Sequence, residues 1–212
     1  MHRTRVKICG LTNAGDAAAA VDAGADALGV IFAPSPRQVT IEQAAAVLAD
    51  VPPFVARVGV FADADPAFVA RAARELGLAA VQFHGEESPE RCGAAPVPVI
   101  KAFRVGTEFA PNTVEPYRGQ VAAVLLDTFV PDTLGGTSTT FAWDLITEPP
   151  GWAPLLLAGG LNPQNVGQAI RTVHPFAVDV SSGVESAPGR KDHARLHAFV
   201  AAVRAADEEV SR

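Results

Sequence analysis

Short apolar runs alternate with amphipathic segments along the whole chain. Runs such as 121–126 (Val-Ala-Ala-Val-Leu-Leu) are apolar at every position, which is typical of parallel strands covered on both faces. The pattern predicts eight strands, over residues 5–10, 26–32, 54–61, 79–83, 97–102, 121–126, 154–158 and 176–180. Helices are expected between and after these strands, over residues 14–23, 41–49, 66–76, 88–93, 141–148, 163–173 and 191–206.

Capping residues support several of the expected helices. Asp65 precedes Pro66, which suits a first helical turn, and Gly77 suits the end of the same helix. Comparable signals are Asn13 and Gly24 around the first helix, Thr40 with Gln43 before the second, and Asn162 with Pro163 before 163–173. The connection over 104–119 contains two prolines and two glycines, so we expect it to be short or irregular.

Eight strands, each followed by a connection, match the count of a (β/α)₈ barrel. We therefore predict an α/β fold in which residues 1–212 form a single compact barrel domain, without a linker or low-complexity tract. A doubly wound open sheet is the alternative architecture, but it usually has fewer strands and a glycine-rich first turn. The first turn of this chain, Cys9-Gly10-Leu11-Thr12, lacks that glycine pattern.

Composition and charge limit the kinds of molecule that we expect this protein to bind. The 212 residues carry a formal net charge of −6, which favours neither a nucleic-acid nor a membrane-surface partner. The two cysteines form neither a disulfide framework nor a zinc pattern, and we expect no metal. The N-terminus lacks a hydrophobic signal region and no apolar run approaches 18 residues, so we expect a cytoplasmic protein.

Chemically active side chains gather where the predicted strands end. In a (β/α)₈ barrel the active site lies at the carboxyl ends of the strands, so this one-sided distribution indicates function. The strand ends and the turns after them carry Cys9, Arg37, Asp63, Gln82 and His84, Lys101 and Arg104, Asp127, Gly159 and Gly160, and Asp179 with Ser181, Ser182 and Gly183.

Cys9 and Asp127 are the candidate catalytic groups. A thiol at the mouth of a barrel is a candidate nucleophile or base, although a lone cysteine in an apolar run is commonly a small core residue. Asp127 follows six apolar residues, where a carboxyl group can act as a general acid. A salt bridge is the other interpretation of Asp127. Asp179 is the alternative carboxylate, and we place it in the predicted substrate-binding set.

The glycines and serines after the last two strands predict a phosphate site. Small residues leave backbone N–H groups open to an anion, and a short helical turn near Gly183 adds its dipole. The residues of this predicted grip are Gly159, Gly160, Ser181, Ser182 and Gly183.

Arg37 and His84 complete the predicted binding set. Arg37 lies in a Pro-Ser-Pro-Arg turn and is suited to two-point binding of a carboxylate, although such an arginine is often only a surface charge. His84 is equally compatible with a catalytic, an orienting or a core role. Cys92 is interpreted as structural, and 207–209 (Asp-Glu-Glu) as a solvated tail.

The motifs, in this order and spacing, resemble those of the phosphoribosylanthranilate isomerases of tryptophan biosynthesis. The resemblance runs nearly end to end. It rests on Lys7-Ile8-Cys9-Gly10, Ser35-Pro36-Arg37, Val58-Gly59-Val60-Phe61, Gln82-Phe83-His84-Gly85, Leu126-Asp127-Thr128, Gly135-Gly136-Thr137, Ala158-Gly159-Gly160-Leu161, Asp179-Val180-Ser181-Ser182-Gly183 and Gly189-Arg190-Lys191-Asp192.

The resemblance implies a compact (β/α)₈ barrel that performs an Amadori rearrangement of a small phosphoribosyl substrate, without metal or cofactor. It implies that Cys9 is the general base, Asp127 the general acid, and Arg37 the arginine that holds the anthranilate carboxylate. It also implies that the loops with Gly160 and Ser182 hold the phosphate. A monomer or a homodimer is compatible with the sequence.

Two departures from the family pattern lie after Asp127. Ser138 stands where the family commonly has glycine, in a loop over 128–139 that we expect to close over substrate, and Ala142 replaces an acidic residue. Two other functions remain to be weighed. A sibling aminoaldose isomerase of histidine biosynthesis would use paired aspartates at the first and fifth strand ends, and a non-catalytic barrel would only bind a phosphosugar.

Overall fold

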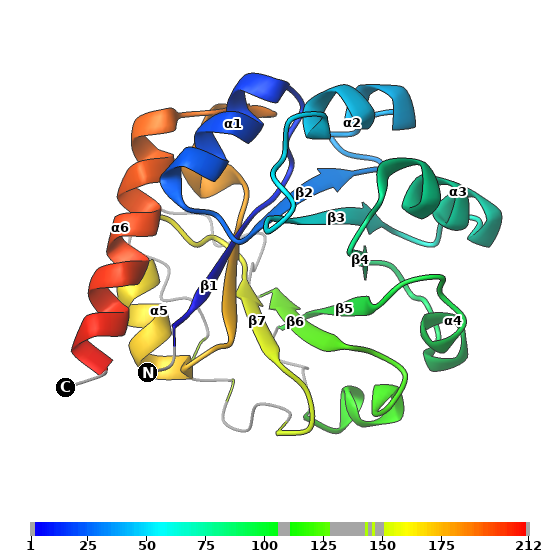
Figure 1. The fold of residues 1–212 in the computed structure, drawn as a ribbon. Coiled ribbons are helices and arrows are strands. Elements are labelled where there is room, and N and C mark those ends of the chain that lie inside the picture. Colours follow the sequence, from blue (N-terminus) through cyan, green and yellow to red (C-terminus); the bar gives the residue numbers. More distant parts are fainter. Residues whose placement is uncertain (1–2, 106–110, 128–142, 144–145, 147–150, 211–212) are drawn as a thin grey trace, which may run out of the picture.

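A closed barrel of eight parallel strands forms the centre of the molecule (Figure 1). The computed structural model describes residues 3–105, 111–127, 143, 146 and 151–210. Strand β1 pairs with both β2 and β8, which closes the barrel. The strands are β1 Arg5–Ile8, β2 Ala27–Ile31, β3 Ala56–Phe61, β4 Ala80–Phe83, β5 Val99–Arg104, β6 Ala123–Asp127, β7 Leu155–Ala158 and β8 Ala177–Val180.

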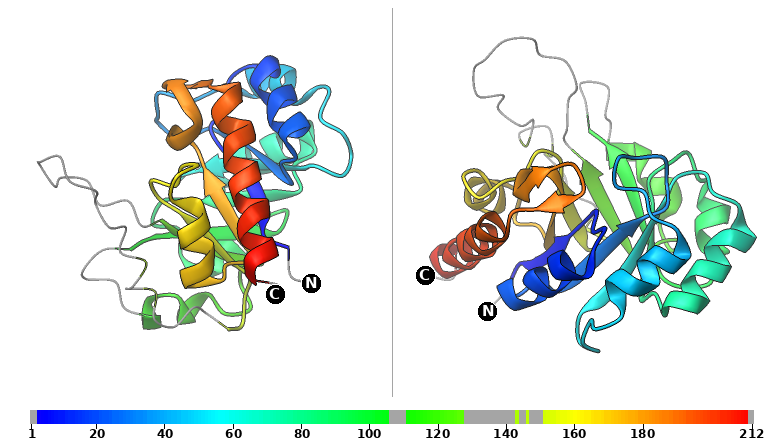
Figure 2. Two further views of the ribbon diagram at one scale, coloured as in Figure 1. Left: turned by 90° about the vertical axis from the view of Figure 1, so that its left-hand side faces the viewer. Right: turned by 90° about the horizontal axis from the view of Figure 1, so that it is seen from above.

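Helices surround the strands on the outside of the barrel, as the further views make clear (Figure 2). The long helix α6 packs beside both α1 and α5. The helices are α1 Ala14–Ala23, α2 Ile41–Leu48, α3 Pro66–Leu76, α4 Pro89–Gly93, α5 Val166–Val173 and α6 His193–Val210. Among the described residues, no helix is long and apolar enough to cross a membrane.

The connection between β5 and β6 is irregular, as its prolines and glycines predict. Its described part contains only the short 3₁₀ turns η1 Pro111–Thr113 and η2 Glu115–Tyr117. The expected loop over 128–139, with Ser138, lies outside the described residues. So does the expected helix over 141–148, except for Trp143 and Ile146, which are both buried.

Local capping chemistry explains where most helices begin. The side chain of Thr40 accepts from the N–H of Gln43 and completes a capping box, and Asp65 caps α3 with Pro66 in its first turn, as predicted. The prediction for 163–173 is wrong at its start. Asn162 accepts from the N–H groups of Gln164 and Asn165 instead, so it stabilises a turn before α5, and the helix starts at Val166.

The C-terminal end also differs from the prediction. A short hairpin of β9 Glu185–Ala187 and β10 Arg190–Lys191 precedes α6, which begins at His193 rather than 191 and continues to Val210. Asp207 is not part of a solvated tail. Its carboxylate accepts from the N–H and hydroxyl of Thr4, with Oδ1 2.6 Å from Oγ1, and so fastens the end of α6 to the start of β1.

Strand alternation sorts the strand side chains into two layers. Successive residues of a strand point to opposite faces. One face packs against the helices, for example through Val6, Ile8 and Val178. The other face fills the barrel with a small cluster that includes Val58, Ile100, Ala102, Ala123, Leu125 and Leu156. The same inward set continues to the carboxyl ends of the strands, where polar residues replace apolar ones.

Candidate functional site

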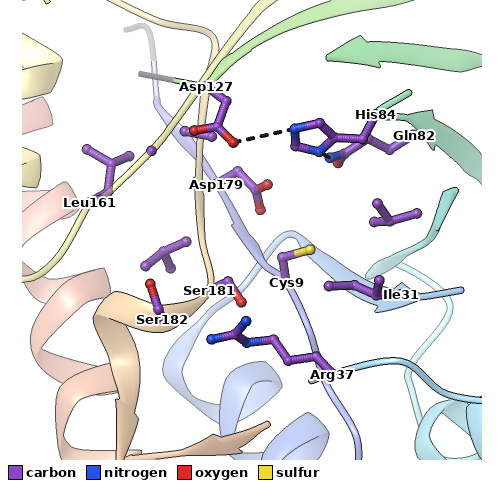
Figure 3. A pocket seen from close by; sticks show the side chains of 15 residues that line it. Cys9, Ile31, Arg37, Gln82, His84, Asp127, Leu161, Asp179, Ser181 and Ser182 are labelled. Carbon is purple, nitrogen blue, oxygen red and sulfur yellow. Dashed lines mark hydrogen bonds and ion pairs between the residues drawn. The ribbon is translucent and has the colours of Figure 1, made fainter. Parts of the chain in front are cut away.

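A pocket of about 360 Å³ opens at the carboxyl ends of the strands (Figure 3). Inward-facing residues at the ends of the strands form part of its lining, and residues of the loops that follow β2, β7 and β8 form the rest. Its lining contains nine of the ten predicted site residues, all except Gly183: Cys9, Arg37, His84, Asp127, Gly159, Gly160, Asp179, Ser181 and Ser182. In the view of Figure 3, Cys9 and Asp179 lie between Arg37 and the pair of His84 and Asp127.

Cys9 follows directly after β1 and is 6% exposed. Its N–H donates to the carbonyl of Val180 over 2.8 Å, and its carbonyl accepts from the ammonium group of Lys191 over 2.7 Å. Burial raises the pKa of the Cys9 thiol, the positive charge of Lys7 opposes that rise, and the negative charge of Asp179 adds to it. Hydrogen bonds thus fix the backbone of the candidate base, while burial disfavours ionisation of its thiol.

Asp127 is the last residue of β6 and faces His84, which follows directly after β4. The carboxylate Oδ2 lies 3.4 Å from Nε2 of His84 (dashed line in Figure 3). The other ring nitrogen, Nδ1, lies 3.3 Å from the side-chain amide nitrogen of Gln82. Both side chains are partly exposed and line the pocket, so His84 is not a core residue and its ring lies beside the Asp127 carboxyl group.

Arg37 is held by a carboxylate that the sequence interpretation did not include. Its Nε and Nη2 donate to the two carboxylate oxygens of Glu185, over 2.8 and 2.6 Å. Burial alone would raise the pKa of Glu185, but Arg37 and Lys191 hold it below its ordinary value. The guanidinium group is therefore fixed in the pocket wall, and within the described parts of the chain nothing accepts from its Nη1.

The loops after β7 and β8 contact each other tightly at a glycine. A Cβ atom added to Gly183 would collide with the carbonyl oxygen of Leu161, which is backbone and cannot give way easily. Gly159 and Gly160 have φ angles of 92° and 60°, which favour glycine. The carbonyl of Gly160 accepts from the side-chain amides of Asn162 and Asn165, so the N–H of Leu161 in the same planar peptide points away from them.

Two buried polar atoms in the pocket lining have no hydrogen-bond partner among the described residues. They are Oε1 of Gln82 and Oγ of Ser181. A buried polar atom without a partner costs free energy, so both are available to polar groups of a ligand. The described residues contain no group of three or more His, Cys, Asp or Glu side chains placed to hold a metal ion.

Sequence reasoning missed three residues that shape this site, and it named Gln82 at a strand end without giving it a role. Lys7 and Gln82 are buried polar residues with apolar neighbours in the chain, which is a usable signal for both. Glu185 and Lys191 lie beyond β8, and no local pattern indicates that they reach Arg37 and Cys9.

The fold and site define a class: a (β/α)₈-barrel protein whose strand ends bring a thiol, a carboxyl group and a fixed arginine beside glycine-rich loops. The profile of the family described as N-(5′-phosphoribosyl)anthranilate (PRA) isomerase matches residues 6–202. The N-(5′-phosphoribosyl)anthranilate isomerase of Geobacter sulfurreducens is 53% identical over 197 residues, which cover 92% of this chain and 96% of that protein.

Solved structures agree with the profile. The phosphoribosyl anthranilate isomerase of Thermotoga maritima superposes with a TM-score of 0.88 at 45% identity, covering 95% of this chain and 99% of that chain. A phosphoribosyl anthranilate isomerase in complex with reduced 1-(o-carboxyphenylamino)-1-deoxyribulose 5-phosphate gives a TM-score of 0.84 at 43% identity, with the same coverage.

The chain therefore belongs to the N-(5′-phosphoribosyl)anthranilate isomerase family. The family, the barrel fold and the enzyme class predicted from the sequence, an isomerase of tryptophan biosynthesis, are confirmed.

Proposed function

We propose that this protein converts N-(5′-phosphoribosyl)anthranilate to 1-(2-carboxyphenylamino)-1-deoxyribulose 5-phosphate, with Cys9 as general base and Asp127 as general acid. The observation that carries the proposal is the placement of both groups in one pocket, together with Arg37 and the glycine-rich β7 and β8 loops. Family membership adds the substrate. The related enzyme solved with the reduced carboxyphenylamino-deoxyribulose phosphate binds a molecule of the same type.

The chemistry needs one acid and one base. Asp127 protonates the ring oxygen of the ribose, and the bond between that oxygen and C1′ breaks to give a protonated imine. The positive charge makes the C2′ proton more acidic, and the Cys9 thiolate removes it. The resulting enolamine tautomerises to the ketone. Holding the substrate in place supplies much of the acceleration.

The two ends of the substrate are held by different parts of the pocket. Arg37 binds the anthranilate carboxylate, because its guanidinium group is fixed by Glu185 and keeps Nη1 for a second anion. Backbone N–H groups near Gly160, Ser182 and Gly183 bind the phosphate. Asp179 lines the same pocket and belongs to the binding set, with its carboxylate paired to Lys7 beneath.

The two rival functions lack support of their own. A sibling enzyme with paired aspartates would need a carboxylate on β5, and the inward residues of that strand include Ile100 and Ala102. A non-catalytic phosphosugar barrel would have no use for a thiol and an acid together at the pocket. Small-molecule binding, a cytoplasmic location and a monomeric or homodimeric state complete the proposal.

Turnover of substrate generated in situ tests this function. We expect a saturable loss of the substrate's fluorescence on addition of the protein. If the protein binds the reduced product analogue but leaves the fluorescence unchanged, it is a binding protein rather than an isomerase.

A further inference from the structure

Lys7 places a positive charge inside the barrel, next to the candidate base. Its side chain is 3% exposed, and its Nζ lies 2.9 Å from Oδ1 of Asp179. Lys7 and Asp179 are partners in the β1–β8 register, so the sheet itself brings them together. Burying a lysine costs free energy unless its charge is paired. A buried charge at this position therefore indicates a role for Lys7.

Cys9 lies two residues after Lys7 and faces the same side of the sheet. Gly29 on the neighbouring strand β2 shows that the two side chains converge. A Cβ atom at Gly29 would lie 2.9 Å from Sγ of Cys9 and 3.3 Å from Cε of Lys7. The side chains of Lys7 and Cys9 therefore both border the space that the missing side chain of Gly29 leaves open.

Four charged groups act on Cys9, namely Lys7 and Asp179 inside the barrel and Lys191 and Arg37 at its rim. The three N–H donors of Lys191 are taken up by the Cys9 carbonyl, the Ser181 carbonyl and Glu185. Arg37 directs Nε and Nη2 to Glu185. Lys7 donates to Asp179 and also interacts with the Cys9 side chain, so Lys7 is the cation best placed to contact the sulfur.

The pKa values agree with this geometry. Burial raises the pKa of Cys9, and the largest opposing influence is Lys7. Burial would lower the pKa of Lys7, but Asp179 and Cys9 outweigh it and raise that pKa, so the ammonium form persists. Asp179 acts in two ways. Its carboxylate keeps Lys7 protonated, and it pairs with the same ammonium group that can stabilise the Cys9 thiolate.

We propose that Lys7 is a positioning residue that stabilises the Cys9 thiolate through its ammonium group, with Asp179 setting how much of that charge reaches the sulfur. This inference rests on the proposed role of Cys9 as the base. Ionisation releases the thiol proton to solvent and leaves the negative sulfur beside the ammonium group. When the thiolate takes the C2′ proton of the substrate it becomes a thiol again, and Lys7 keeps its protons throughout.

The pH dependence of Cys9 alkylation tests the inference without turnover. Iodoacetamide reacts with the thiolate and loses iodide, and peptide mass spectrometry separates Cys9 from Cys92. We expect Lys7→Met to raise the apparent pKa of Cys9 by about one unit or more, a tenfold loss of thiolate at neutral pH. We expect Asp179→Asn to lower it, because the direct repulsion of the carboxylate is lost and the ammonium group of Lys7 no longer pairs with a second anion.

Lys101→Met is the matched control. Lys101 is also a buried lysine paired with one carboxylate, Glu87 at 2.9 Å, but the pair lies apart from the groups that act on Cys9. We expect this variant to change the Cys9 pKa by less than about 0.3 unit. An equal shift in Lys101→Met and Lys7→Met, or no shift in folded Lys7→Met, overturns the inference. If Lys7→Met does not fold, Lys7→Gln takes its place, because it keeps a hydrogen-bond donor for Asp179 without the charge. A rise in the Cys9 pKa in that variant supports the inference, and a fall or no change overturns it.

Turnover separates this inference from the proposed function. In Lys7→Met we expect activity to recover as the pH rises, which a purely structural defect would not produce. Should Cys9→Ala keep its turnover, the base assignment fails while the alkylation profile still reports on Lys7. Should Cys9→Ala lose turnover while the profile of Lys7→Met is unchanged, the base assignment stands and the role of Lys7 is refuted.

Discussion

The guanidinium group of Arg37 forms a two-point ion pair with the carboxylate of Glu185, at 2.8 and 2.6 Å, across 148 residues of sequence. Glu185 also accepts from Lys191, whose side chain is fully buried. Two cations at the rim of the barrel are thus fixed by one carboxylate. Because the donors Nε and Nη2 are occupied, the orientation of Arg37 in the pocket is set before any ligand binds.

Removing the charge of Glu185 should weaken both the fold and the substrate grip. Glu185→Gln leaves two cations around a neutral amide, and we expect a loss of about 3 kcal/mol in the free energy of unfolding, as for other broken buried ion pairs. We also expect KM to rise about tenfold, the scale of one charged hydrogen bond. Denaturant unfolding and steady-state kinetics measure the two effects.

The matched control is Glu115→Gln. Glu115 makes the same two-point contact with Arg118, but at the exposed surface. Such pairs contribute little, so we expect small changes in stability and in KM. Equal effects in the two variants would contradict the role given to Glu185.

The contact between Gly183 and Leu161 gives a test of the phosphate grip. In Gly183→Ala the new methyl group meets the Leu161 carbonyl, so the β7 and β8 loops must separate. We expect inhibition by inorganic phosphate to weaken by about tenfold or more, since a hydrogen bond to a charged ligand is lost. Gly151→Ala should leave it unchanged, because a Cβ atom there meets nothing within 4 Å. Unaltered phosphate inhibition in a folded Gly183→Ala variant would place the anion elsewhere.

His84 should assist Asp127 rather than replace it. Its ring nitrogen lies 3.4 Å from the Asp127 carboxylate, so His84→Asn removes an orienting contact and leaves the acid in place. We expect kcat to fall about tenfold, well short of the loss in Asp127→Asn. Losses of the same size in both variants would indicate that His84 itself transfers the proton.

Asp16 should contribute to stability in acid. Burial alone would raise its pKa, but hydrogen bonds from the Lys191 N–H, the His193 ring and the Asn13 amide outweigh it and lower the pKa. A lowered pKa stabilises the fold above the unfolded value of about 4, and this contribution is lost as the pH falls through the lower folded value. Asp16→Asn should therefore reduce the free energy of unfolding at neutral pH. It should also make that free energy decrease less steeply as the pH is lowered from about 5 to 2. Thermal unfolding at a series of pH values measures this effect. If the unfolding temperature of the variant falls as steeply in acid as that of the parent protein, the prediction is wrong.

Much of the fold follows from local sequence. Apolar runs and caps such as Thr40 with Gln43 act within a few residues, so the pattern predicts the strands and most helix starts. The errors arise where distant contacts decide. Asp207 looks like part of a polar tail until β1 brings Thr4 to it, across 203 residues.

The residues of the site also fall into those that local sequence predicts and those that depend on distant contacts. Alternation and strand ends suffice to place Cys9, His84 and Asp127 at one rim, because that layer is a property of the barrel itself. The partners Glu185 and Lys191 come from a hairpin after β8, whose approach to Arg37 and Cys9 depends on the closed fold. The charge on Lys7 is visible in the sequence, but its meeting with Asp179 depends on the β1–β8 register.

Cys9 and Asp127 are expected to transfer the protons of the reaction, while other groups of the pocket bind the substrate. Steady-state turnover of in situ-generated N-(5′-phosphoribosyl)anthranilate by Cys9→Ala and Asp127→Asn, with product-analogue affinity measured on the same samples, tests this expectation most directly. We predict that turnover falls by a factor of about 10² or more in each variant while affinity stays within about threefold of the parent protein. Near-normal turnover in either folded variant would contradict the account.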